Sequence, residues 1–130
     1  MTSGRIETES DAGAALAAGA WVDVVALDEL TPGRGVAALV GGRQVAIFLV
    51  ASGELFAVDN HDPFSETYVL SRGLVGDRDG VPKVASPMYK QSFDLRTGRC
   101  LDDDSVRIPV YPVRVESGRV QVTAQPASGP

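Results

Sequence analysis

Two short polar segments in the middle of the chain, residues 59–66 and 86–92, carry most of the side chains suited to chemistry. The candidate site residues in them are His61, Asp62, Pro63, Ser86, Tyr89, Lys90 and Gln91. Imidazole and carboxylate groups bind metals or move protons, whereas hydroxyl, amide and ammonium groups form hydrogen bonds. Pro87 restricts Ser86 to an extended backbone, so we expect the second segment to present its side chains at a loop tip.

Strands must position these segments, because from Trp21 onward apolar residues recur with a period of two. Runs at residues 35–40 and 43–50 flank a Gly-Gly pair, which predicts a hairpin. A short strand at residues 55–58 directly precedes the first polar segment, and residues 82–85 lead into the second. Each polar segment therefore follows a predicted strand.

The C-terminal part predicts a last hairpin, formed by residues 106–115 and 119–124. Pro109 and Pro112 should lie at a sheet edge or bulge, because proline cannot donate to the strand ladder. No window beyond the N-terminal tail sustains a helical period. Many short strands with regular turns predict an all-β fold, an antiparallel sandwich or small barrel with two protruding loops.

Length and composition predict one domain. The 130 residues divide into a flexible tail at 1–19, a β domain at 20–124 and a flexible tail at 125–130. A net charge of −5, with 12 basic residues scattered among 17 acidic ones, argues against nucleic-acid binding. No apolar stretch approaches the roughly 20 residues needed to cross a bilayer, so we expect no membrane role.

The first residues do not read as a secretory signal, because Glu7, Glu9 and Asp11 lie where such a signal is basic and then apolar. The single cysteine, Cys100, cannot form an internal disulfide, whereas small secreted domains usually have several. Both features predict a cytoplasmic protein.

The second segment and the turn after it resemble a Rieske iron–sulfur domain. That family's second loop reads Cys-Pro-x-His-Gly and is followed by a turn with Phe-Asp and Thr-Gly. Here Pro87, Phe93-Asp94 and Thr97-Gly98 match the pattern, but Ser86, Tyr89 and Lys90 occupy the Cys, His and Gly positions. A Rieske centre needs two Cys and two His. The chain has one of each, and only His61 could bind metal near residues 60–63 of the first loop. The resemblance therefore implies a Rieske-like fold with no cluster of its own.

Three runs, residues 58–64, 70–77 and 85–103, resemble the small subunit of the assimilatory NAD(P)H-dependent nitrite reductase. The resemblance implies a large-subunit partner that carries FAD, an iron–sulfur cluster and sirohaem and reduces nitrite to ammonium. The expected role is that of an accessory subunit, which binds the large subunit rather than carrying electrons. A free-standing binding module for a small ligand or another protein is the alternative. An electron-transfer ferredoxin and an enzyme acting alone are disfavoured.

Each candidate residue also has a structural interpretation. His61 reads more simply as a loop residue bonded to a neighbour, and Tyr89 either contributes to a docking surface or is a partly buried aromatic. We expect His61, Tyr89 and Lys90 to fill the volume of the lost cluster or to face outward. Cys100 reads as a small apolar core residue. The run at residues 102–104, three aspartates, reads as a solvated acidic turn.

Overall fold

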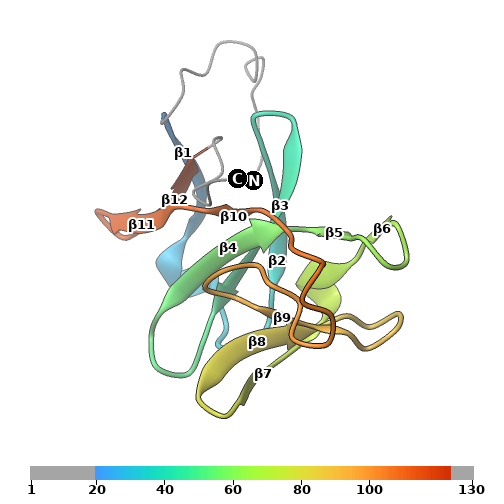
Figure 1. The fold of residues 1–130 in the computed structure, drawn as a ribbon. Helices are drawn as coiled ribbons and strands as arrows, with labels where there is room; N and C mark the ends of the chain where they lie inside the picture. Colours follow the sequence, from blue (N-terminus) through green and yellow to red (C-terminus); the bar gives the residue numbers. More distant parts are fainter. Residues whose placement is uncertain (1–19, 124–130) are drawn as a thin grey trace.

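The period-two runs form antiparallel strands, which confirms the predicted all-β class (Figure 1). The computed structural model describes residues 20–123, and the tails predicted at 1–19 and 125–130 lie outside the described residues. The strands are β1 (Trp21–Ala26), β2 (Val36–Val40), β3 (Arg43–Leu49), β4 (Leu55–Asp59), β5 (His61–Asp62), β6 (Thr67–Tyr68), β7 (Leu74–Arg78), β8 (Val81–Ala85), β9 (Ser92–Asp94), β10 (Val110–Tyr111), β11 (Val113–Glu116) and β12 (Arg119–Thr123). Single 3-10 turns lie at Leu27–Glu29 and Leu70–Arg72.

The strands of the described residues form four antiparallel sheets, with the orders β1-β12-β11, β10-β4-β3-β2, β5-β6 and β7-β8-β9. The hairpin predicted across the Gly-Gly pair is present, since Val40 pairs with Arg43 at the β2–β3 turn. Strands β5, β6, β7 and β9 were not predicted, and Phe93-Asp94, expected to belong to a turn, is part of β9. The β5–β6 hairpin lies in and just after the polar segment at residues 59–66, which was expected to be irregular. The residues of β7 show no clear period of two.

The sheet β10-β4-β3-β2 is covered on both faces, so β3 is buried without alternation. Val45 and Ile47 face a cluster that includes Val120 and Val122 of β12. The intervening residues of β3, Ala46 and Phe48, face a second cluster that includes Phe93 of β9. A strand buried on both faces reads as a continuous apolar run. The sheet therefore forms the central layer between two cores.

The single hairpin strand predicted at residues 106–115 is divided at a proline into two strands. β10 pairs with β4 at one edge of the central sheet, and β11 pairs with β12 in another sheet. Pro112 lies between these two strands, where the chain leaves one sheet for the other. This position satisfies the expectation of an edge, because no ladder hydrogen bond is required from its nitrogen.

Both predicted loops protrude from this framework. The β5–β6 hairpin and the loop from β8 to β9 project on the same side of the domain, at the right of Figure 1. Within residues 20–123, no helix is long and apolar enough to cross a membrane.

We predict that Gly98→Ala is severely destabilising. Gly98 has φ +80°, and an added Cβ would lie 2.0 Å from the carbonyl oxygen of Ile108. Left-handed strain together with a backbone clash should lower the free energy of unfolding by about 3 kcal/mol or more, measurable by urea denaturation. Gly118→Ala is the control, because Gly118 has φ +77° and open space around a Cβ. Its loss should be only about 1 kcal/mol, and equal losses would contradict the clash.

Candidate functional site

The two protruding loops are built alike. The first loop spans residues 62–67 and the second loop spans residues 86–91. In both loops the second residue is proline. The amide of Glu66 donates to the carbonyl of Asp62 at 2.7 Å, and the amide of Lys90 donates to the carbonyl of Ser86 at 3.0 Å. Each loop thus turns the chain over four residues and returns it to a strand.

A side-chain hydrogen bond joins the two loops. The hydroxyl of Ser86 donates to Oδ2 of Asp62 at 2.5 Å, and both residues are buried. The same Oδ2 accepts the hydroxyl of Ser65 at 3.0 Å, and Oδ1 accepts the amide of Phe64 at 2.9 Å. The Asp62 carboxylate therefore fixes its own loop and the neighbouring one together.

These donors determine the charge state of Asp62. Burial opposes ionisation of its carboxyl, but the hydrogen bonds from Ser86, Phe64 and Ser65 outweigh it and hold the pKa below its usual value. Asp62 is consequently an anion at neutral pH. A buried charge is stable here because hydrogen-bond donors replace its lost water.

The loops do not fit a Rieske cluster. Of the described residues, no group of three or more His, Cys, Asp or Glu could hold a metal ion. Ser86 occupies a cysteine position of the pattern, and its hydroxyl is 2.5 Å from the Asp62 carboxylate. The Ser86 hydroxyl and the Asp62 carboxylate therefore satisfy each other as hydrogen-bond donor and acceptor. Iron–sulfur clusters also require thiolate or imidazole ligands, which Ser86 and Tyr89 lack.

The other predicted site residues line the outer part of the loops. Tyr89 is 59% exposed and Lys90 is also exposed, so both face outward, as one of the two expectations held. His61 is half-buried, and its ring centroid lies 5.0 Å from that of Tyr68. It was expected to be a loop residue, but it lies in β5 and pairs with Tyr68, the neighbour that its ring contacts.

Pro63 and Gln91 complete the predicted set. Pro63 is half-buried at the start of the first loop. Gln91 closes the second loop, because its carbonyl accepts the amide of Ser86 at 2.8 Å. Its side-chain Oε1 is buried and has no hydrogen-bond partner among the described residues.

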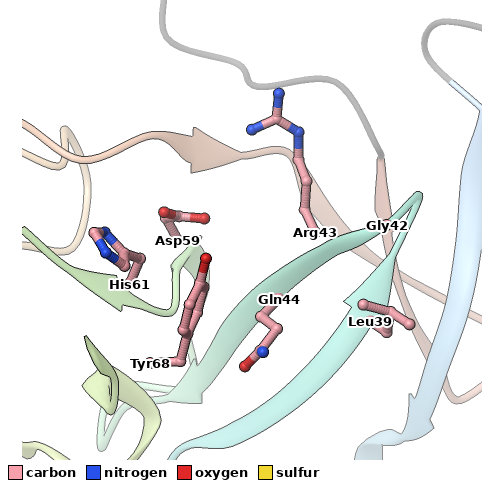
Figure 2. Close-up of a pocket in the computed structure, with 7 residues that line it drawn as sticks. All are labelled: Leu39, Gly42, Arg43, Gln44, Asp59, His61 and Tyr68. Atoms are coloured by element: carbon pink, nitrogen blue, oxygen red, sulfur yellow. The ribbon is translucent and has the colours of Figure 1, made fainter. Parts of the chain in front are cut away.

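A pocket of about 320 Å³ lies beside the first loop (Figure 2). It is lined by Leu39, Gly42, Arg43, Gln44, Asp59, His61 and Tyr68. Desolvation raises the pKa of Asp59, although His61 and Arg43 oppose the shift. Arg43 also donates a long hydrogen bond, 3.5 Å, to the hydroxyl of Tyr111. The pocket thus contains charges of both signs.

Cys100 and the aspartate run have structural roles. Cys100 is fully buried in the apolar cluster around Phe93, as predicted. The aspartates have separate local partners: Asp102 accepts the amide of Ser92 at 2.8 Å, and Asp103 accepts the hydroxyl of Ser105 at 2.6 Å. Asp104 is largely exposed, as expected for an acidic turn.

Sequence reasoning located the loops but missed the bond between them and the pocket beside them. The pocket residues Arg43, Asp59 and Tyr68 come from three strands, and no local motif groups them. The sequence contains one weak signal of the hydrogen bond between the loops. A small polar residue precedes proline in both loops, as Asp62-Pro63 and Ser86-Pro87.

The fold and the paired loops define a class of protein. A family model described as the Rieske-like [2Fe-2S] domain matches residues 20–123, so the chain belongs to that family. The nitrite reductase (NADH) small subunit of Salmonella typhimurium is 46% identical over 103 residues, 78% of this chain and 95% of that protein. Within the Rieske-like family, this chain belongs with the nitrite reductase small subunits.

Two further relatives extend the comparison. A crystal structure of an NADH-dependent nitrite reductase small subunit from Mycobacterium tuberculosis is 52% identical, with a TM-score of 0.78, and covers 79% of this chain and 93% of that one. The nitrite reductase [NAD(P)H] large subunit of Klebsiella oxytoca is 43% identical over 105 residues, 81% of this chain but 11% of that protein. The same kind of domain therefore occurs both as a separate chain and as part of a much longer one.

We predict that Ser86→Ala lowers the free energy of unfolding at pH 7 by about 1–3 kcal/mol, because a buried carboxylate loses a donor. The folded-state pKa of Asp62 is depressed, so its contribution is full above the unfolded pKa of about 3.9 and is lost as pH falls through the folded value. The difference between wild type and variant should accordingly shrink below about pH 4. Urea denaturation from pH 7 to pH 3 measures it.

Ser65→Ala is the matched control, because Ser65 donates to the same Oδ2 from within the first loop. It removes a donor without separating the loops, so its cost should be smaller. A Ser86→Ala protein as stable as wild type at pH 7 would contradict the role of the cross-loop bond.

Proposed function

We propose that this chain is the accessory small subunit of an NAD(P)H-dependent nitrite reductase and binds the catalytic large subunit directly. The observation that carries the proposal is the Klebsiella oxytoca large subunit, which contains a domain 43% identical to this chain. Fusion in one polypeptide keeps that domain beside the rest of the enzyme. A chain that carries the domain alone must reach the same place by association.

The proposed role is structural rather than redox. The complex reduces nitrite to ammonium with FAD, an iron–sulfur cluster and sirohaem, all held by the large subunit, and it works in the cytoplasm, where nicotinamide reductants are available. The paired loops support this division, because Ser86 and Asp62 satisfy each other and leave no thiolate or imidazole set for iron. Such cofactors perform the electron transfer, and protein surfaces supply binding and orientation.

The loops are the proposed docking surface. Tyr89 and Lys90 are exposed at the tip of the second loop, and Met88 beside them is 48% exposed. Large side chains exposed together on a rigid framework favour a protein contact. Among the predicted docking residues, Asp62 and Ser86 are buried and so shape the loops from beneath. The remaining predicted docking residues, His61, Pro63 and Gln91, are half-buried.

The alternative, a free-standing module, has one observation in its favour. The pocket between Arg43, Asp59 and Tyr68 has the volume to hold a small polar ligand. Its charged groups already attract each other, however, so a charged ligand would have to compete with them. The family relationship supports the subunit role over this alternative.

We predict that the chain forms a stable complex with its large subunit in size-exclusion chromatography. Omitting it should lower the nitrite reductase activity or the yield of soluble large subunit. Purified alone, the chain should contain no stoichiometric iron or acid-labile sulfide, because the loops lack the ligands. A two-iron cluster in the isolated chain, or a large subunit indifferent to it, would contradict the proposal.

The variant Tyr89→Ala/Lys90→Ala should weaken the complex about tenfold or more, since two exposed docking side chains are truncated. Val115→Ala is the control for loss of an exposed apolar side chain, because Val115 is 42% exposed on β11, outside both loops. Titration calorimetry measures both affinities. Equal losses in the two variants would place docking away from the loop tips.

A further inference from the structure

In both loops the residue before the last has a backbone conformation that favours glycine. Glu66, in the first loop, has φ +59°, and Lys90, in the second loop, has φ +70°. Side chains with a Cβ are disfavoured in this left-handed region, and the residues that tolerate it best, Asn and Asp, do so through short local hydrogen bonds. Lysine has no such compensation.

Strain at the other described positions of this kind has a local explanation. Asp79 and Ser117 are the remaining non-glycine residues of the described chain with positive φ, and each precedes a glycine that also has positive φ. Two successive left-handed residues are the requirement of a type I′ hairpin turn. Lys90 is followed by Gln91, which does not have a positive φ, so no type I′ turn accounts for the backbone of Lys90. Glycine at this position would suit the backbone better.

Folding contacts do not explain the lysine. Lys90 is exposed, and its ammonium takes part in none of the ion pairs among the residues that the structure describes. It is one of only two lysines in a chain with a net charge of −5. A strained residue that the fold does not need is evidence for a role outside the fold.

We propose that Lys90 is a specificity-determining docking residue whose ammonium pairs with a carboxylate of the large subunit. This inference rests on the proposed function and names the chemistry of the contact. Met88 and Tyr89 precede Lys90 in the same loop and are 48% and 59% exposed, so large side chains flank the charge in the sequence. On docking they exclude water from the ion pair and strengthen it. The surface recognised is therefore an acidic group within an apolar rim.

The experiment separates backbone strain from side-chain contact. Lys90→Gly and Ser117→Gly both relieve left-handed strain, the first at the loop tip and the second in the remote β11–β12 turn. Both should raise the Tm of the isolated full-length chain, by about 2–4 °C. Only Lys90→Gly should weaken binding to the intact large subunit, by about fivefold to tenfold, and reduce the salt dependence of that binding.

Lys90→Arg retains the charge and should bind within about twofold of wild type, whereas Lys90→Glu should bind more weakly than Lys90→Gly. Calorimetry at two salt concentrations gives all the affinities. A Lys90→Gly chain that binds like wild type overturns this inference and leaves the proposed function standing. A wild-type chain that does not bind overturns both. A Lys90→Gly chain less stable than wild type also overturns the inference, because the strain would not be real.

Discussion

The hydrogen bond between Ser86 and Asp62 is the contact on which the loop surface depends. It joins two loops that follow different sheets and lie 24 residues apart in the chain. In a Rieske centre a metal cluster holds the equivalent loops together. Here an ionised carboxylate does so, and its two oxygens accept hydrogen bonds from three donors. Without that set of donors, the buried charge would destabilise the fold instead of organising it.

The central sheet makes this bond possible. β4 leads into the first loop after two residues, and it is held between β3 and β10. The second loop follows β8, whose Val84 packs into the same apolar cluster as Ala46 and Phe48 of β3. Both loops therefore extend from one core. The position of Asp62 relative to Ser86 is set by packing, and the hydrogen bond fixes it further.

The sequence predicted the features that depend on local chemistry. The Gly-Gly pair predicted the β2–β3 hairpin, and proline predicted an edge or bulge near Pro112, because backbone rules act at short range. The division of residues 106–115 between two sheets was not predicted. The β5–β6 hairpin was missed, because two-residue strands are too short to show a period. The bond between Asp62 and Ser86 and the pocket residues were missed for another reason. They depend on how distant strands pack, and a single sequence does not encode that in any one segment.

The residues of each loop divide by depth into those that serve the fold and those that face outward. Asp62 and Ser86 are buried, and their side chains are committed to each other. Tyr89 and Lys90 face outward instead. A cluster ligand at the position of Tyr89 would have to point inward, toward the other loop. Because a hydrogen bond between two small side chains joins the loops, the side chains at the tip of the second loop are available for contacts outside the domain. Lys90 has a left-handed backbone at the position where the Rieske pattern has glycine, so the side chain there is not one that the backbone favours.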